Sequence, residues 1–412
     1  MKTLDKQLTD NFFRYAAVTS QSDAASPAVP STEGQRELGK LLVQELQALG
    51  LVDVHMDEHA IVTARRPGTV ASAPAIGFVA HLDTVDVAIS PHVHPQVLHF
   101  TGQDLCLNKE QDIWFRVDEH PESAPYKGQD IIFSDGTSVL GADNKAAITV
   151  IMTLLANLKA ENPPMGDMYV AFVPDEEIGL KGSNKLDLQR FPVQFAYTID
   201  SCGLGEVVYE TFNAAFATLE ITGITAHPMS AKNVLVNPLR VAHDFMGYFD
   251  RRDTPEHTEG REGYFWFTDM VANPNKAVLQ MAIRDFDKAS FEERKAFIQQ
   301  AATLVQARHP RAKVTCTVTD VYSNIANAVG KEGHPSIALI FEAMQELGIT
   351  PNVIAMRGGT DGSALSARGL VTPNYFTGAH NFHSPFEFLP VPSFVSSYEL
   401  TRRICELNAK KR

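Results

Sequence analysis

The sequence predicts an α/β domain interrupted by a smaller α+β domain, and two observations carry this prediction. Strand-length runs that are apolar throughout, typical of strands covered on both faces, alternate with helical or loop stretches, and this pattern resumes after residue 323. Residues 211–322 instead follow the order βαββαβ, which is ferredoxin-like. We therefore assign residues 1–210 and 323–412 to the α/β domain and residues 211–322 to the insertion.

Helix and strand signals follow in chain order. The small-residue segment Ser20–Ser31 is expected to be a mobile loop, and Ser31 or Thr32 caps a helix that ends before Gly50. The next elements are strands at Ala75–Ala80, Ile131–Phe133, Met168–Val173 and Phe195–Ile199, and a buried helix at Ala146–Leu158. The insertion contains strands at Ala215–Thr222, Tyr264–Ala272, Ala277–Phe286 and Lys313–Val318 and helices at Pro238–Arg251 and Ser290–Arg308; a helix at Pro335–Gly348 and a strand at Asn352–Met356 follow it.

Composition excludes several classes of protein. The 36 basic and 49 acidic residues of the 412-residue chain give a net charge of 36 − 49 = −13, which argues against nucleic acid or an anionic membrane as the partner. Four cysteines without a CxxC pair predict free thiols in a reducing compartment. The N-terminus has no secretory signal, and Ala146–Leu158 is too short to span a bilayer. These features predict a cytoplasmic protein.

Polar side chains follow three of the predicted strands. His81 comes directly after one strand, Glu177 follows a second, and Asp200 ends a third. Ligands bind at the carboxyl ends of strands in open α/β sheets, so these side chains are expected to meet at one edge. Asp143, at the entry to the apolar helix, and His383, near the C-terminus, complete the set.

This residue set is typical of a metal centre. Two imidazoles and three carboxylates suit zinc, or cobalt or manganese, and five ligands with one bridging carboxylate support two ions about 3.5–4 Å apart. Asp83 could orient His81, and Glu176, beside the ligand Glu177, could act as a general base. Each piece alone has an ordinary structural reading, such as a helix cap or a surface carboxylate, but their convergence at several strand ends favours the metal centre.

The motifs resemble those of the dizinc aminopeptidase and aminoacylase superfamily that includes carboxypeptidase G and peptidase T, and peptidase T is the closer match. The resemblance rests on HLDTVD (81–86), SDGTSVLGADNKAA (134–147), AFVPDEEIG (171–179), FAYTID (195–200), GEVVYETFNA (205–214), GITAHP (223–228), RGGTDGSALSARG (357–369) and TGAHNFHSPFEF (377–388). It implies a zinc-binding α/β domain split by a lid domain, with two zinc ions.

The resemblance also implies a role for each residue. Asp143 would bridge two ions, one of which also takes His81 and Asp200, and the other Glu177 and His383. Glu176 would be the general base, Asp83 the orienting carboxylate, and His227 of the insertion a donor to the oxyanion. The peptide bond after Asp143 is often cis in such sites. The chain departs from the family pattern at Asn144, at His383-Ser384-Pro385 and at Cys202, which either contacts the metal or packs.

Substrate contacts are predicted around Arg357. Arg357 could bind a C-terminal carboxylate bidentately, and Thr360 and Asp361 follow it in the same segment. Arg284 could serve the same purpose or pair with Asp285 or Asp287.

The predicted function is a dizinc exopeptidase that releases the N-terminal residue from short peptides, most simply tripeptides. The alternatives are an N-acyl-amino-acid deacylase, a dipeptidase or a carboxypeptidase of the same architecture, or a non-catalytic metal-dependent binding protein. A homodimer formed through the lid domain is also compatible with the resemblance.

Overall fold

A computed structural model describes residues 3–330 and 332–411, which form two compact units. Unit 1 contains the described residues of segments 1–209, 328–354 and 360–412, and unit 2 contains residues 210–327 and 355–359. Unit 1 is α/β and unit 2 is an α+β insertion, so the predicted fold class is confirmed.

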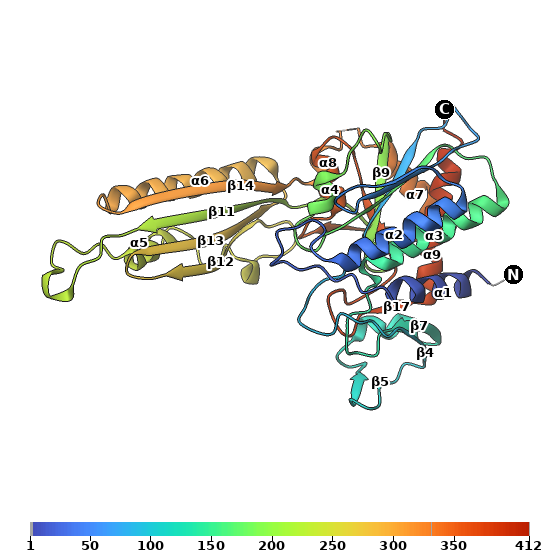
Figure 1. Cartoon of the computed structure of the whole chain (residues 1–412), viewed down its shortest axis with the longest axis horizontal. Coiled ribbons are helices and arrows are strands. Elements are labelled where there is room, and N and C mark those ends of the chain that lie inside the picture. The colour runs from blue at the N-terminus through green and yellow to red at the C-terminus, as the bar shows by residue number, and fades with distance from the viewer. Residues whose placement is uncertain (1–2, 331, 412) are drawn as a thin grey trace. The chain divides into compact units, whose positions relative to one another are not determined.

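Unit 1 is built on an eight-stranded sheet of order β1-β2-β8-β3-β9-β16-β10-β15 (Figure 1). The strands in this order are Val52–Met56, Val62–Arg66, Met168–Val173, Ile76–His81, Phe195–Ser201, Asn374–Phe376, Glu206–Thr211 and Asn352–Met356. The central neighbours β8, β3, β9 and β16 are parallel, whereas β1, β2 and β10 run antiparallel to the neighbours with which they are registered. The carboxyl ends of the central strands therefore lie along one edge of the sheet.

Both faces of this sheet are covered, which explains why its central strands are apolar throughout. In β3, Phe78 and Ala80 pack into a large cluster with the helices on one face, and Val79 points into a second cluster with Leu365 on the other. The first face carries α1 (Leu4–Ala16), α2 (Glu33–Leu49), α3 (Ala142–Glu161), α7 (Pro335–Leu347) and α9 (Val391–Asn408), and α8 (Asp361–Ala367) contributes to the second. The short α4 (Lys181–Lys185) contacts α8.

The predicted strand at Ile131–Phe133 does not join the large sheet, which corrects our expectation. It forms part of β7 (Gln129–Phe133), the centre of a three-stranded sheet with β4 (Gln96–Phe100) and β17 (Phe388–Pro390). The hairpin of β5 (Leu105–Asn108) and β6 (Ile113–Phe115) and the 3-10 helix η1 (Pro121–Tyr126) lie in the same chain segment. A small aromatic core, including Phe100, Phe115, Phe133 and Phe388, gives this segment its own apolar centre.

Unit 2 has a four-stranded antiparallel sheet of order β12-β13-β11-β14 (Figure 1). This is the order expected of a ferredoxin-like βαββαβ chain. Its elements are β11 (Asn213–Thr222), α5 (Pro238–Met246), β12 (Tyr264–Ala272), β13 (Lys276–Asp285), α6 (Lys288–Arg308) and β14 (Lys313–Tyr322), with short 3-10 helices at Pro228–Ser230, Pro255–His257 and Ile325–Asn327. Helix α5 ends at Met246 rather than at the predicted Arg251.

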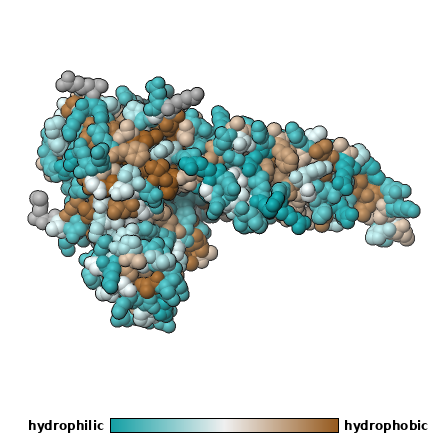
Figure 2. Space-filling model, turned by 180° about the vertical axis from the view of Figure 1, so that it is seen from behind, coloured by the Kyte–Doolittle hydropathy of each residue, from teal (hydrophilic) through white to brown (hydrophobic). Residues whose placement is uncertain are grey.

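The surface, the helices and the cysteines can be compared with what the composition predicts. The face shown in Figure 2 is mostly hydrophilic, with hydrophobic residues in separate patches. Within the described residues, no helix is both long and apolar enough to span a bilayer. All four cysteines are free thiols, as predicted.

Candidate metal centre

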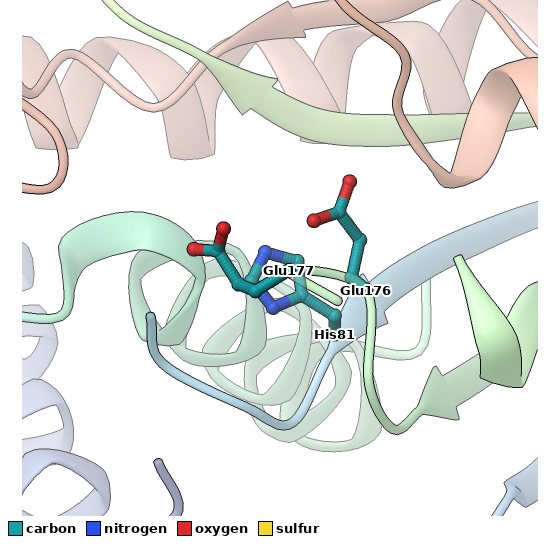
Figure 3. Close-up of side chains that lie close together, drawn as sticks. All are labelled: His81, Glu176 and Glu177. Carbon is teal, nitrogen blue, oxygen red and sulfur yellow. The ribbon is translucent and has the colours of Figure 1, made fainter. Parts of the chain in front are cut away.

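The carboxyl edge of the large sheet gathers the predicted ligands of unit 1. His81 is the last residue of β3, Asp200 lies near the end of β9, and Glu177 follows β8 in a loop. Figure 3 shows the carboxylates of Glu176 and Glu177 extending from this loop on the same side as the His81 imidazole. Because β8, β3 and β9 are parallel neighbours, their ends place these side chains together.

One group of possible ligands consists of His81, Asp143 and Asp200, which each offer a ligand atom within 4.8 Å of the others. His81 Nε2 lies 2.8 Å from Asp143 Oδ1 and 3.8 Å from Asp200 Oδ1. Asp143 is held at the entry to α3 by non-helical backbone angles, φ −81° and ψ 99°, after the left-handed Gly141. The peptide bond from Asp143 to Asn144 is cis.

A second group consists of Asp143, Glu177 and His383. His383 Nε2 lies 3.2 Å from Asp143 Oδ2 and 3.0 Å from Glu177 Oε1. Asp143 therefore presents one carboxylate oxygen to each histidine, as a carboxylate shared by two ions would. The structure brings the five predicted ligands together in the two groups that the resemblance implies.

Burial and mutual repulsion raise the pKa values of most of these carboxyl groups. Burial and the charge of Asp143 raise the pKa of Glu177 to about 7 and that of Asp200 to about 6. Burial also raises the pKa of Glu176 well above its ordinary value, although His81 opposes this shift. Asp143 differs, because hydrogen bonds from His383 and His81 outweigh burial and hold its pKa below the ordinary range.

The pKa values of both imidazoles are raised as well. A hydrogen bond to Asp143 and the nearby carboxylate of Glu177 raise the pKa of His383 to about 10. For His81, burial acts to lower the pKa, but its contacts with Asp143 and Asp200 hold the pKa well above its ordinary value. Without metal, bound protons reduce the negative charge of the buried carboxyl groups. Divalent cations would neutralise this charge in place of the protons.

The donor set fits divalent metal ions. Glu177 Oε1 is buried and accepts no hydrogen bond, although it lies close to His383 Nε2. A buried carboxylate oxygen without a donor is costly, and a cation between it and the imidazole nitrogen would satisfy both atoms. Imidazole and carboxylate ligands in this mixture suit zinc, cobalt or manganese.

Asp83 lies beside His81, but its contact differs from the one expected. The Nδ1 atom of His81 is 2.9 Å from the Asp83 backbone oxygen, whereas the Asp83 carboxylate is 3.4 Å away. That carboxylate accepts hydrogen bonds from the backbone N–H groups of Glu176 and Glu177, at 3.0 and 3.2 Å. Asp83 therefore links the His81 ring to the loop that carries Glu176 and Glu177.

Cys202 packs rather than joining either group of possible ligands. Its backbone N–H donates to the Glu206 carboxylate, and burial, with the charge of Glu206, raises the pKa of its thiol. A neutral thiol is a poor metal ligand, because binding requires the thiolate.

Thr360 and Asp361 have structural partners within unit 1, and their contact with substrate stays a prediction. Thr360 is the N-cap of α8, and its hydroxyl accepts from the Gly362 N–H. Asp361 is buried and accepts from the Ser183 hydroxyl at 2.6 Å, and burial raises its pKa to about 7.

The arginines predicted to bind substrate belong to unit 2, as does His227. The Arg357 guanidinium donates to the backbone oxygens of Gly260 and Glu262 and to Thr258 Oγ1, which occupies most of its donors. Arg284 pairs with neither Asp285 nor Asp287, the alternative considered for it. It donates to backbone carbonyls of the sheet. His227 is exposed on the loop before Pro228–Ser230, where its ring accepts from the Met229 N–H.

Sequence analysis missed the residues that hold His383 and Asp143 in place. Glu387, fully buried, accepts from the backbone N–H groups of Gly141 and Asp143. Asn381, two residues before His383, donates to Glu122 of η1 at 2.6 Å. Both Asn381 and His383 have left-handed backbone angles, φ 59° and 63°. The only sequence signal was the position of Asn381 and Glu387 within the same motif as His383.

The loop after β8 depends on Gly182, and we expect Gly182→Ala to destabilise the protein. A Cβ there would lie 2.3 Å from the backbone oxygen of Pro174. This clash is costly because the oxygen belongs to the backbone and cannot move aside as the end of a flexible side chain could. The expected loss is about 1–3 kcal/mol in urea unfolding, with weaker metal binding because the loop carries Glu177. Gly330→Ala, where a Cβ meets nothing within 4 Å, is the control; equal effects would contradict this reading.

Comparisons with known proteins identify a family model and two relatives that match most of the chain. Residues 117–407 match the model of the family described as peptidase family M20/M25/M40. The chain is 65% identical over 407 residues to a peptidase T-like protein of Yersinia pestis, covering 99% of each chain. It is 41% identical over 412 residues to peptidase T of Geobacillus kaustophilus, covering 99% of this chain and 100% of that one.

The fold is also found among solved structures. An aminopeptidase PepT from Bacillus cereus aligns with a TM-score of 0.77 at 21% identity, covering 99% of each chain. This likeness concerns the fold, which extends through both units.

Proposed function

The chain belongs to peptidase family M20/M25/M40 and, within it, to the peptidase T group, and on that premise we propose that it is a metal-dependent aminopeptidase that releases the N-terminal residue of tripeptides. The observation that carries the proposal is the Asp143 carboxylate, which faces His81 with one oxygen and His383 with the other, while Glu176 lies close to His81 and Glu177. Two zinc ions, for which cobalt or manganese could substitute, are the proposed cofactors.

Each ligand has a proposed place. His81, Asp143 and Asp200 would hold one ion, and Asp143, Glu177 and His383 the other. Ions bound there would lower the pKa of a water molecule and polarise the peptide carbonyl.

Glu176 is the proposed general base. Its side chain lies close to those of His81 and Glu177. Two hydrogen bonds fix its backbone: its N–H donates to the Asp83 carboxylate, and its carbonyl accepts from the Leu180 N–H. The carboxylate would take the proton of the attacking water and return it to the leaving amine when the peptide bond breaks. His227 as oxyanion donor, Arg357 and Arg284 as substrate contacts, and lid movement about residues near 210 and 323 stay predictions.

The proposed partners are short peptide substrates, and neither nucleic acid nor a membrane is a proposed partner. The proposed location of the protein is the cytoplasm. A homodimer formed through unit 2 would use its sheet, where Trp266 and Phe216 are large exposed side chains.

Hydrolysis of matched di-, tri- and tetrapeptides with free or acetylated amino termini, by metal-loaded and chelated protein, tests the proposal. Metal-dependent cleavage confined to tripeptides with a free amino terminus is the expected result. Cleavage of the acetylated peptides would make the protein a deacylase instead, and cleavage from the carboxyl end a carboxypeptidase. A protein that binds two ions but cleaves nothing would be a binding protein.

A further inference from the structure

Asp175 is a buried carboxylate next to the proposed general base that the proposed reaction does not use. It lies between β8 and Glu176 and is completely buried. Its backbone is left-handed, with φ 56°, a conformation that a non-glycine residue keeps only where its surroundings hold it. Its backbone oxygen accepts from the Lys181 N–H, which closes the loop behind Glu176 and Glu177.

The partners of Asp175 come from the start of α2, far away in the chain. Ser31 donates to it twice, from its N–H at 2.8 Å and from its hydroxyl at 2.5 Å. The Gln35 amide donates to Oδ1 at 2.7 Å, and its oxygen accepts from the Asp175 N–H at 3.0 Å. Gln35 is also completely buried. A buried carboxylate is tolerated because donors satisfy it, and the α2 N-terminus adds favourable dipoles.

This pairing corrects the expectation that Ser20–Ser31 is a mobile loop. The Ser31 hydroxyl also accepts from the Asp23 N–H at 2.9 Å, and the Ser20 hydroxyl donates to the Leu82 backbone oxygen at 2.7 Å. The segment therefore contacts the loops that follow β3 and β8.

The loop that carries Glu176 and Glu177 is fixed on both sides. The Asp83 carboxylate receives the N–H groups of Glu176 and Glu177, while the side chain and N–H of the preceding residue, Asp175, are bound by Ser31 and Gln35. A shift at Asp175 would rotate the backbone at the point where both glutamate side chains leave it. Metal ligands and general bases tolerate little displacement, so such a shift would weaken metal binding by Glu177 and proton transfer by Glu176.

We propose that Ser31, Gln35 and Asp175 are positioning residues for Glu176 and Glu177, acting through the reciprocal amide–carboxylate pair of Gln35 and Asp175. This inference rests on the proposed function. Loss of the pair should weaken the ion held by Glu177 and slow turnover by Glu176, with kcat falling more than KM changes, because the substrate contacts lie elsewhere.

A swap of the two groups tests the pair. Gln35→Glu sets two buried carboxylates against each other. Asp175→Asn sets an amide NH2 group against either the Gln35 amide donor or the Ser31 N–H, because the Asp175 carboxylate accepts from both through different oxygens. In the double variant, the new amide at position 175 donates to the new carboxylate at position 35, which still accepts from the N–H of residue 175. We expect each single change to weaken Co²⁺ binding to the metal-free full-length chain about 10- to 100-fold, the range for residues that orient ligands. The double variant should return to within a few-fold of the unmodified chain.

The measurements are calorimetric Co²⁺ titration, the visible spectrum of bound Co²⁺, and kcat and KM on a tripeptide. Gln44→Glu makes the same change at an exposed position of the same helix and should alter none of them. If a single variant does not fold by circular dichroism, Ser31→Ala, which removes one hydroxyl, carries the test with an expected loss of several-fold. Normal Co²⁺ binding and turnover in the folded variants would overturn this inference alone. Failure of the unmodified chain to bind Co²⁺ would overturn the proposed function as well.

Discussion

Glu176→Gln is expected to lower kcat on a tripeptide by about 10²- to 10⁴-fold while both metal ions stay bound, because general-base catalysis contributes that much and the amide cannot take a proton. The substitution keeps the shape of the side chain. It leaves untouched the backbone contacts that hold the loop, which run from Glu176 to Asp83, Gly179 and Leu180. KM should change little, so the loss would appear in kcat.

Glu177→Gln is the matched comparison, since it makes the same change one residue later. Glu177 Oε1 lies 3.0 Å from His383 Nε2 and accepts no hydrogen bond, which leaves it available to a metal ion. Glu177→Gln should therefore lose the ion that Glu177 binds and keep the general base. Metal content measured on both variants separates the two roles. Activity of Glu176→Gln within a few-fold of the unmodified enzyme would show that another group is the base.

The sequence indicates which side chains meet at the candidate metal centre because of the positions that they occupy relative to the strands. His81 and Asp200 end strands that are buried on both faces, and uninterrupted apolar runs mark such strands clearly. The ferredoxin-like order of unit 2 was equally readable, since each element is long enough to show its period.

The parts that sequence analysis missed or misplaced depend on contacts between distant segments. Strand β7 is apolar and short like β3, and its pairing with β4 on one side and with β17, more than 250 positions later, on the other places it in another sheet. The local sequence around Ser31 and Gln35 indicates only the start of an ordinary helix. Their partner Asp175 is 140 or more residues away, so no local pattern could reveal the contact.

Metal removal is expected to abolish activity and to reverse the effect of pH on stability. In the metal-free protein, the pKa values of Glu177, Asp200 and Glu387 are about 7, 6 and 8, above the ordinary values of 4.5, 3.8 and 4.5. The folded state then binds protons more tightly than the unfolded state, so the stabilisation is complete below pH 4 and disappears as pH rises to about 8. His383, with a pKa of about 10 against 6.5, extends the decline beyond pH 8.

The metal-loaded protein should behave in the opposite way over this range. Ions and protons compete for the same carboxylates and imidazoles, so metal affinity rises with pH and metal uptake releases protons. At a free metal concentration 1,000 times Kd, each site adds about 4 kcal/mol to the free energy of unfolding. The gap in Tm between loaded and chelated protein should therefore widen from pH 6 to pH 8.5.

Thermal unfolding at several pH values, with and without chelator, checks this result, and calorimetry in buffers of different ionisation enthalpy counts the released protons. Metal-free Glu177→Gln should show a shallower decline between pH 5 and 7, because one of the titrating carboxyl groups is gone. Glu110→Gln, at an exposed position of unit 1, should keep the full decline. A metal-free protein whose Tm rises from pH 6 to 8.5 would mean that the buried carboxylates are neutralised by something other than protons, and the proposed competition with metal would be wrong.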